Sequence, residues 1–350
     1  MTHRFLALLG VVVVVVAAVW LMAVPVAGQS QTAGKAYTPP KTPWGDPDLQ
    51  GIYNIATSTP LQRPAELGEK VVLTEEEAAQ FQEEVAENLT RDRRDGGAQA
   101  DLNRAYNDHW MDAKRLLITQ DRRTSLIVDP PDGRIPALVP LSPERQKRRA
   151  AAADGQRRFL AGMPWGPEET ANAFRCIIRT DRPPYQGIIY NNTYQIFQSP
   201  GYVVILVEMI HSARIIPVDG RPHIGKNIGQ WLGDTRGRWE GNTLVLETTN
   251  YRNDSVTFGN ANPDTYRLTE RLTRIDANAI KYEFTVADPQ TWSKPFTAWA
   301  PWNKTEEQLY EYACHEDNYD MVHLLAGGRE REKRGETADP GAQRPGAEDR

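Results

Sequence analysis

The feature that most constrains the fold is a series of short turns in the second half of the chain. Each turn separates segments rich in Val, Ile, Leu, Thr and aromatic residues, a composition typical of β-strands. The turns are Ser199-Pro200-Gly201, Val218-Asp219-Gly220, Glu240-Gly241-Asn242 and Asp276-Ala277-Asn278. Such short connections favour antiparallel neighbours, because a parallel pair needs a crossover of about a dozen residues or more. The sequence therefore predicts an antiparallel sheet.

Seven segments of the same region are candidate strands. They span residues 188–197, 202–216, 230–239, 243–251, 266–275, 280–286 and 309–314. A meander of this kind closes most readily into a barrel or a strongly curled sheet, and small barrels commonly hold one ligand. We therefore predict a mainly β fold, an antiparallel β-barrel or strongly curled sheet within residues 175–326, lipocalin-like in architecture.

The other segments complete the predicted domain organisation. Residues 1–28 combine a basic start, a long apolar run and small residues, so we predict a cleaved signal peptide, with a retained N-terminal anchor as the alternative. Residues 29–174 are predicted to wrap the barrel with extended segments and helices, two of which begin at the capping residues Thr74 and Ser142. Residues 327–350 are charged and poor in apolar side chains, and are predicted to be disordered.

A signal peptide or an N-terminal anchor predicts that the rest of the chain is exported and is periplasmic or secreted. The cysteines fit such a location. The chain contains two, Cys176 and Cys314, and disulfides persist in oxidising compartments. We predict that they form a disulfide bond. Two free buried thiols are the alternative.

Composition and missing motifs narrow the class of protein. The net charge of −5 gives no reason to expect a nucleic acid or an anionic membrane surface as a partner. The sequence contains no phosphate loop, dinucleotide fingerprint, HExxH, CxxC or nucleophile-elbow motif. We therefore expect no cofactor, a small molecule as substrate or ligand, and contact with a membrane only through an uncleaved N-terminal segment.

Titratable side chains crowd the first part of the strand-rich region. A turn near Asp219 would bring His211 and His223 together as acid and base, with Asp219 or Asp234 orienting an imidazole. Arg214 would then stabilise developing negative charge. The alternative is a hydrogen-bonded histidine pair that only stabilises a turn.

Two further titratable residues, His315 and Glu316, directly follow Cys314. The predicted disulfide would hold both at a fixed place, as a catalytic site requires, so they are candidates to complete the site. They could equally be polar side chains at the end of a strand.

Aromatic and charged side chains also suggest a surface for a ringed substrate. Trp231 and Trp239 offer flat apolar faces, with Arg236 and Glu240 close in sequence and Tyr190 as a further candidate. The alternative is a glycine-rich hairpin whose tryptophans pack in the core and whose Asp–Arg pairs hold the turn.

Five sequence motifs resemble those of a family of exported bacterial proteins of unassigned function. They are TPWGDPDLQG, DRRTSLIVDPPDGR, YVVILVEMIHSARIIPVDGRPH, WLGDTRGRWEGNTLVLETTNY and YEYACHEDNY. The resemblance covers nearly all of the chain after the N-terminal segment. It implies export and one shared architecture, and it implies no activity.

Three functions remain as hypotheses. The first is an exported, cofactor-free enzyme of isomerase, lyase or cyclase type that performs acid–base chemistry on a small ringed or apolar substrate in a barrel pocket. The second is a lipocalin-like binding protein for a hydrophobic ligand. The third is a metal-dependent hydrolase with His211, His223 and one carboxylate as ligands.

Overall fold

The computed structural model describes residues 37–90, 96–98, 108, 111–112, 116–252, 257–336 and 338. The predicted signal peptide or anchor, residues 1–28, lies outside them. None of the described helices has the length and apolar character needed to cross a lipid bilayer.

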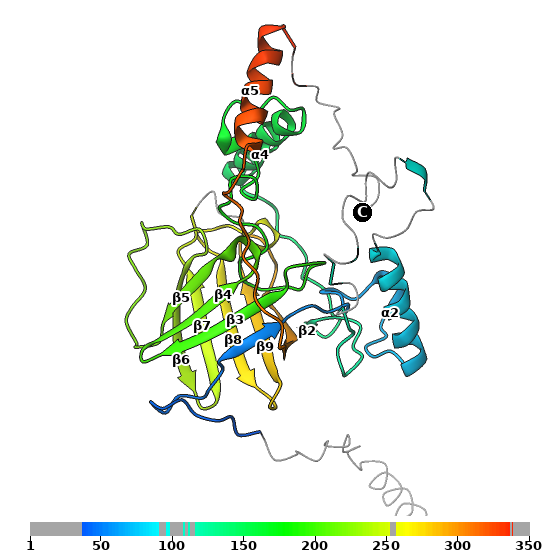
Figure 1. Cartoon of the computed structure of the whole chain (residues 1–350), viewed down its shortest axis with the longest axis vertical. Coiled ribbons are helices and arrows are strands. Elements are labelled where there is room, and N and C mark those ends of the chain that lie inside the picture. The colour runs from blue at the N-terminus through cyan, green and yellow to red at the C-terminus, as the bar shows by residue number, and fades with distance from the viewer. Residues whose placement is uncertain are drawn as a thin grey trace, which may run out of the picture. The chain divides into compact units, whose positions relative to one another are not determined.

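The structure is dominated by one antiparallel sheet and has few helices (Figure 1). Its strands are β1 (Gly51–Asn54), β2 (Ile127–Asp129), β3 (Thr193–Ser199), β4 (Tyr202–Val207), β5 (Ala213–Pro217), β6 (Asp234–Glu240), β7 (Thr243–Thr249), β8 (Arg267–Arg274), β9 (Ala279–Ala287) and β10 (Phe296–Lys304). The α-helices are α2 (Glu75–Leu89), α4 (Pro143–Leu160) and α5 (Asp320–Lys333), and the 3-10 turns are η1 (Ala65–Leu67), η4 (Pro167–Glu169), η5 (Met209–His211) and η6 (Phe258–Asn260).

The sheet consists of two meanders joined by a strand from the N-terminal part of the chain. The strand order is β5-β4-β3-β1-β10-β9-β8-β7-β6, and β2 pairs with β10 beside this path. The edge strands β5 and β6 lie side by side, because Arg214 on β5 donates to Thr235 Oγ1 on β6 at 3.1 and 2.9 Å. Gly237 allows this approach, since a Cβ there would lie 2.7 Å from Val218. The sheet is therefore a nearly closed barrel, which confirms the predicted fold class.

Alternating side chains fill the barrel interior. On β9, Tyr282 and Phe284 are buried, and on the paired strand β10, Phe296 and Trp302 are buried, while every second residue of both strands is more exposed. This period of two is what a strand with one buried face requires. Burial of each large apolar side chain contributes about 1.5–3 kcal/mol.

Strand β10 was missed by sequence reasoning because Pro301 lies in its middle, and proline is rare inside a sheet. Trp299, two residues before Pro301, donates its N–H to Leu126 O beside β2. Residues two apart in a strand direct their N–H groups to the same edge, so the N–H that Pro301 lacks would also lie on the edge of β10 that faces β2. That edge is unpaired at Pro301, because β2 pairs with residues 297–298 and β1 with residues 303–304. The predicted strand at 309–314 is wrong, since these residues form no strand.

The connection between β4 and β5 also differs from the prediction. Residues 202–216 were expected as one strand, but η5 interrupts them, with positive φ angles at Ile210 and His211. A β-branched residue at positive φ is an outlier, so the sequence gives no ordinary turn signal here. The expected turn at 218–220 instead begins a loop that reaches β6 at Asp234.

Two helices begin at their predicted caps, and a third helix, α5, lies partly where disorder was predicted. Thr74 forms the capping box of α2, and Ser142 caps α4. The predicted disorder from residue 327 is wrong as far as Lys333, the end of α5. Tertiary contacts hold this charged helix: Arg329 donates to Pro164 O at 3.4 Å and to Trp165 O, and Arg331 donates to Ala161 O.

Candidate ligand-binding site

A segment between the helical region and β3 inserts one side chain into the barrel. We call residues 177–192 the plug segment. Its Tyr185 is 1% exposed and packs on Tyr194, Tyr282 and Trp302 at ring-centroid distances of 5.0, 6.0 and 5.8 Å. Tyr185 N–H donates to Tyr282 OH at 3.0 Å. The plug segment is thus fixed to the barrel core.

The barrel interior also contains a buried ion pair, formed by Arg214 and Glu270. Arg214 Nη1 donates to Glu270 Oε1 at 3.0 Å, Arg214 Nη2 donates to Thr248 Oγ1 at 2.7 Å, and Tyr282 OH donates to the same Glu270 oxygen at 2.7 Å. Burial acts to lower the pKa of Arg214, but the Glu270 carboxylate outweighs it and holds that pKa above its usual value. Each Arg214 guanidinium nitrogen therefore already has a partner inside the protein.

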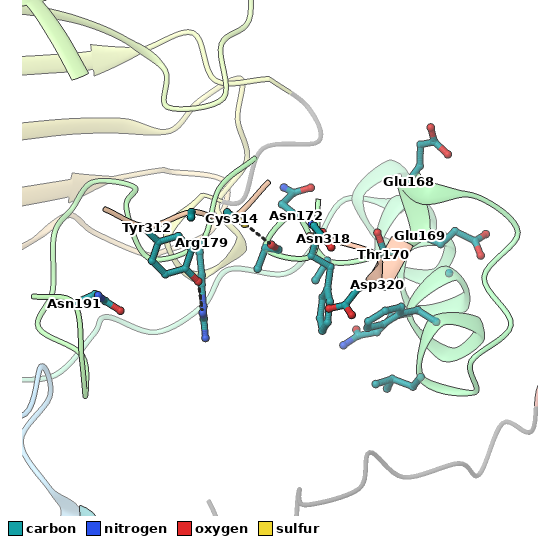
Figure 2. Close-up of a pocket in the computed structure, with 18 of the residues that line it drawn as sticks. Glu168, Glu169, Thr170, Asn172, Arg179, Asn191, Tyr312, Cys314, Asn318 and Asp320 are labelled. Carbon is teal, nitrogen blue, oxygen red and sulfur yellow. Dashed lines mark hydrogen bonds between the residues drawn. The ribbon is translucent and has the colours of Figure 1, made fainter. Parts of the chain in front are cut away.

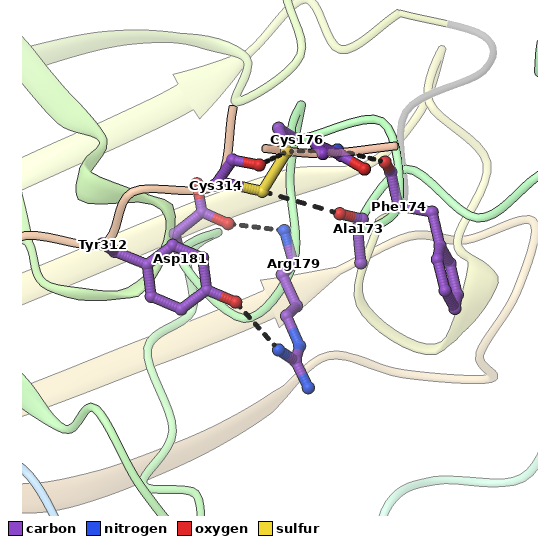
Figure 3. The surroundings of a disulfide bond; sticks show 8 residues. Ala173, Phe174, Cys176, Arg179, Asp181, Tyr312 and Cys314 are labelled. Atoms are coloured by element: carbon purple, nitrogen blue, oxygen red, sulfur yellow. Dashed lines mark hydrogen bonds between the residues drawn. A yellow bond between two sulfur atoms is a disulfide. The ribbon is translucent and has the colours of Figure 1, made fainter. Parts of the chain in front are cut away.

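The disulfide bond joins Cys176, directly before the plug segment, to Cys314 in the chain that follows β10 (Figure 3). Cys176 and Cys314 are 138 residues apart in sequence, with Cα atoms 5.7 Å apart, which confirms the predicted bridge. Asn318 Nδ2 supports the same junction by donating to Phe174 O at 3.1 Å. The bond fits a non-reducing compartment.

The disulfide brings a cation and a tyrosine together from distant parts of the sequence. Arg179 lies three residues after Cys176, and Tyr312 lies two before Cys314. Arg179 Nη1 donates to Tyr312 OH at 3.1 Å, and Nη2 donates to Tyr190 OH. The two hydroxyls thus fix the direction of the guanidinium.

These side chains line an open cavity of about 1330 Å³ between α4, the plug segment and the chain before α5. Its wall includes Phe159, Phe174, Arg179, Tyr190 and Tyr312. Figure 2 shows Arg179 and Tyr312 on the side of the strands, and Glu168, Glu169 and Asp320 on the side of the helices. The cavity is large enough for an organic molecule, since ligand pockets span about 300–1,000 Å³.

Arg179 supplies a positive charge to a cavity wall that also contains the carboxyl groups of Glu168, Glu169, Glu311, Asp317 and Asp320. In the part of the chain that the structure describes, its guanidinium has hydroxyl partners and forms no ion pair with a carboxylate. By contrast, Glu169 on the opposite side is bound by Arg158, whose hydrogen bonds lower the pKa of Glu169. A partly buried guanidinium without a counter-ion favours an anionic group of a ligand.

A buried carboxyl group, that of Asp181, binds the backbone N–H of Arg179. Arg179 N–H donates to Asp181 Oδ1 at 2.6 Å, and Asp181 is 1% exposed. Burial raises the pKa of Asp181.

Four residues described above were not predicted from the sequence: Arg179, Asp181, Tyr312 and Glu270. For two of them, Arg179 and Tyr312, the sequence holds one signal, which is that each lies close to a cysteine.

The predicted histidine pair is not formed. Among the described residues no hydrogen bond or ion pair joins His211, exposed in the β4–β5 turn, to His223. His223 Nδ1 instead lies 2.7 Å from Asp234 Oδ2, and Asp234 Oδ1 accepts from Arg236 at 2.6 Å. The η5 turn explains the difference, because it places His211 between β4 and β5 and not across from His223.

The other predicted site residues are dispersed. Asp219 pairs with Arg221, whose hydrogen bonds lower the pKa of Asp219. The remaining positions are as follows: Trp231 stacks under Arg252 at 4.4 Å, Trp239 packs against the core, Glu240 pairs with Arg238 and Arg271, and His315 and Glu316 are exposed beyond the disulfide. Of the predicted substrate-binding residues, Tyr190 lines the cavity.

The three-ligand metal site considered from the sequence is not formed either. The described residues bring together no group of three or more His, Cys, Asp or Glu side chains that could hold a metal ion. Among these residues, His223 lies beside the carboxylate of Asp234, and His211 does not join them as a third ligand.

Comparison with known proteins adds no relative, since no family model, no curated protein and no solved structure matches the chain. The resemblance to exported bacterial proteins stays a prediction from the sequence motifs.

Proposed function

We propose that this is an exported ligand-binding protein whose cavity takes a small molecule with an anionic group, best a carboxylate. The observation that carries the proposal is the Arg179 guanidinium, which lines the cavity, is braced by Tyr190 and Tyr312, and forms no ion pair among the described residues. Guanidinium and carboxylate match in geometry and charge. A hydrogen bond to a charged group contributes about 1.5–3 kcal/mol.

The contents of the barrel favour this cavity over a ligand inside the lumen. Trp302, Tyr282 and Phe284 are no more than 1% exposed and occupy the interior. Arg214, the cation predicted to act on a substrate, is engaged by Glu270 and two threonines. The binding-protein hypothesis therefore applies to the cavity beside the disulfide.

An acid–base enzyme is the second candidate, and one contact favours it. Asp234 orients His223 through Nδ1, as a carboxylate orients a catalytic imidazole. His223 is partly exposed, with 31% of its side chain accessible. Turnover of a ringed carboxylate that is lost in His223→Ala would place this candidate ahead of simple binding.

Calorimetric titration with benzoate tests the binding proposal. We expect Arg179→Gln to weaken benzoate binding by about tenfold to a hundredfold, because it removes one charge-assisted interaction. Arg267→Gln is the matched control: Arg267 is exposed, bonds the carbonyl oxygens of Asp264 and Tyr266, and does not line the cavity. Equal affinities of the wild type and Arg179→Gln, or no benzoate binding at all, would reject the proposal.

A further inference from the structure

The cavity has a smaller neighbour of about 460 Å³ at the junction of α4 and α5. We call this space the apolar annex. It is defined by Phe159, Leu160, Gly162, Phe174, Asp320, His323 and Leu324. Phe159, Leu160, Phe174 and Asp320 also line the larger cavity, so the two spaces adjoin.

The annex is lined largely by carbon. Phe159 and Phe174 meet edge to face with ring centroids 5.4 Å apart, and Leu160 and Leu324 add aliphatic surface. Phe174 also belongs to the turn that is fastened by Asn318 and the disulfide. The annex therefore offers apolar surface next to the cavity that Arg179 lines.

Contacts between α5 and the chain that follows α4 give the annex a fixed form. Gly328 of α5 lies against the chain after α4, where an added Cβ would be 3.3 Å from Met163 Cα. Two arginines of α5 bind the same part of the chain: Arg331 donates to Ala161 O, and Arg329 donates to Pro164 O. A preformed apolar space can bind an apolar group without ordering the chain first.

We infer that the annex holds the apolar arm of the same molecule whose carboxylate contacts Arg179, so that the ligand is an amphipathic monocarboxylate with an alkyl or aryl arm. The inference rests on the proposed function, and it adds the class of ligand. Continuity of the two spaces supports one shared occupant. Asp320, which lines both, disfavours a second anionic group at this end.

Calorimetric titration with butanoate, hexanoate and octanoate tests the inference. In the wild type, affinity should rise about fourfold per methylene group as the chain enters the annex. Leu324→Ser should weaken octanoate binding several-fold and leave butanoate binding unchanged. Val322→Ser is the matched control, since Val322 lies on the same helix, is 64% exposed and does not line the annex.

The outcomes separate the inference from the proposed function. Equal affinities for butanoate and octanoate, both reduced in Arg179→Gln, would overturn the inference and leave carboxylate binding in place. A chain-length effect that Leu324→Ser and Val322→Ser change equally would also overturn it. Failure of all three carboxylates to bind would reject both.

Discussion

Replacing Glu270 with glutamine should lower the free energy of unfolding by about 3–5 kcal/mol. Arg214 and Glu270 are 5% and 0% exposed, so the variant leaves a guanidinium charge in the barrel without its counter-ion. Water cannot compensate a charge held at such depth. Urea unfolding followed by tryptophan fluorescence measures the change.

A second glutamate provides the control for this prediction. Glu283 pairs with Lys281 at 2.6 Å on the outward face of β9, where both side chains are partly exposed. Glu283→Gln should cost no more than about 1 kcal/mol, because exposed ion pairs contribute little. If Glu270→Gln were no more destabilising than Glu283→Gln, the Arg214–Glu270 pair would not be shielded from water inside the barrel.

Removing the disulfide by Cys176→Ser with Cys314→Ser should lower the free energy of unfolding by about 2–5 kcal/mol. The bond spans 138 residues, and a loop of that length restricts the unfolded chain strongly. The variant should also bind benzoate more weakly, because the bond holds Arg179 beside Tyr312. Urea unfolding and calorimetry give the two readouts.

The reduced wild-type protein is the control for the disulfide. Dithiothreitol should make the wild type as unstable as the double serine variant, and it should leave that variant unchanged. A variant with the stability and benzoate affinity of the oxidised wild type would show that the bond neither stabilises the fold nor positions Arg179.

The fold was predictable where one local signal decided the outcome. Short turns predicted the antiparallel barrel, Thr74 and Ser142 predicted two helix starts, and the expectation of export predicted the Cys176–Cys314 bond. The predictions of secondary structure failed where contacts between distant parts of the chain decide the structure. Pro301 is tolerated in β10 because its edge faces the gap between β2 and β1, and no sequence pattern shows that gap.

The candidate site was less predictable, because it depends on which charges find partners. A high density of titratable residues pointed to His211, Arg214 and His223, yet barrel closure pairs Arg214 with Glu270 and the loop before β6 pairs His223 with Asp234. Arg179 lines the cavity and has no carboxylate partner among the described residues. That property becomes visible only when the chain is folded.

The most direct test of the cavity as a ligand site is the crystal structure of the protein with 4-bromobenzoate, read from the anomalous signal of bromine. We expect the carboxylate within hydrogen-bond distance of Arg179 and the bromine peak toward Phe174, in the cavity. A bromine peak inside the barrel beside Arg214, or no peak in the cavity at a saturating concentration, would contradict it.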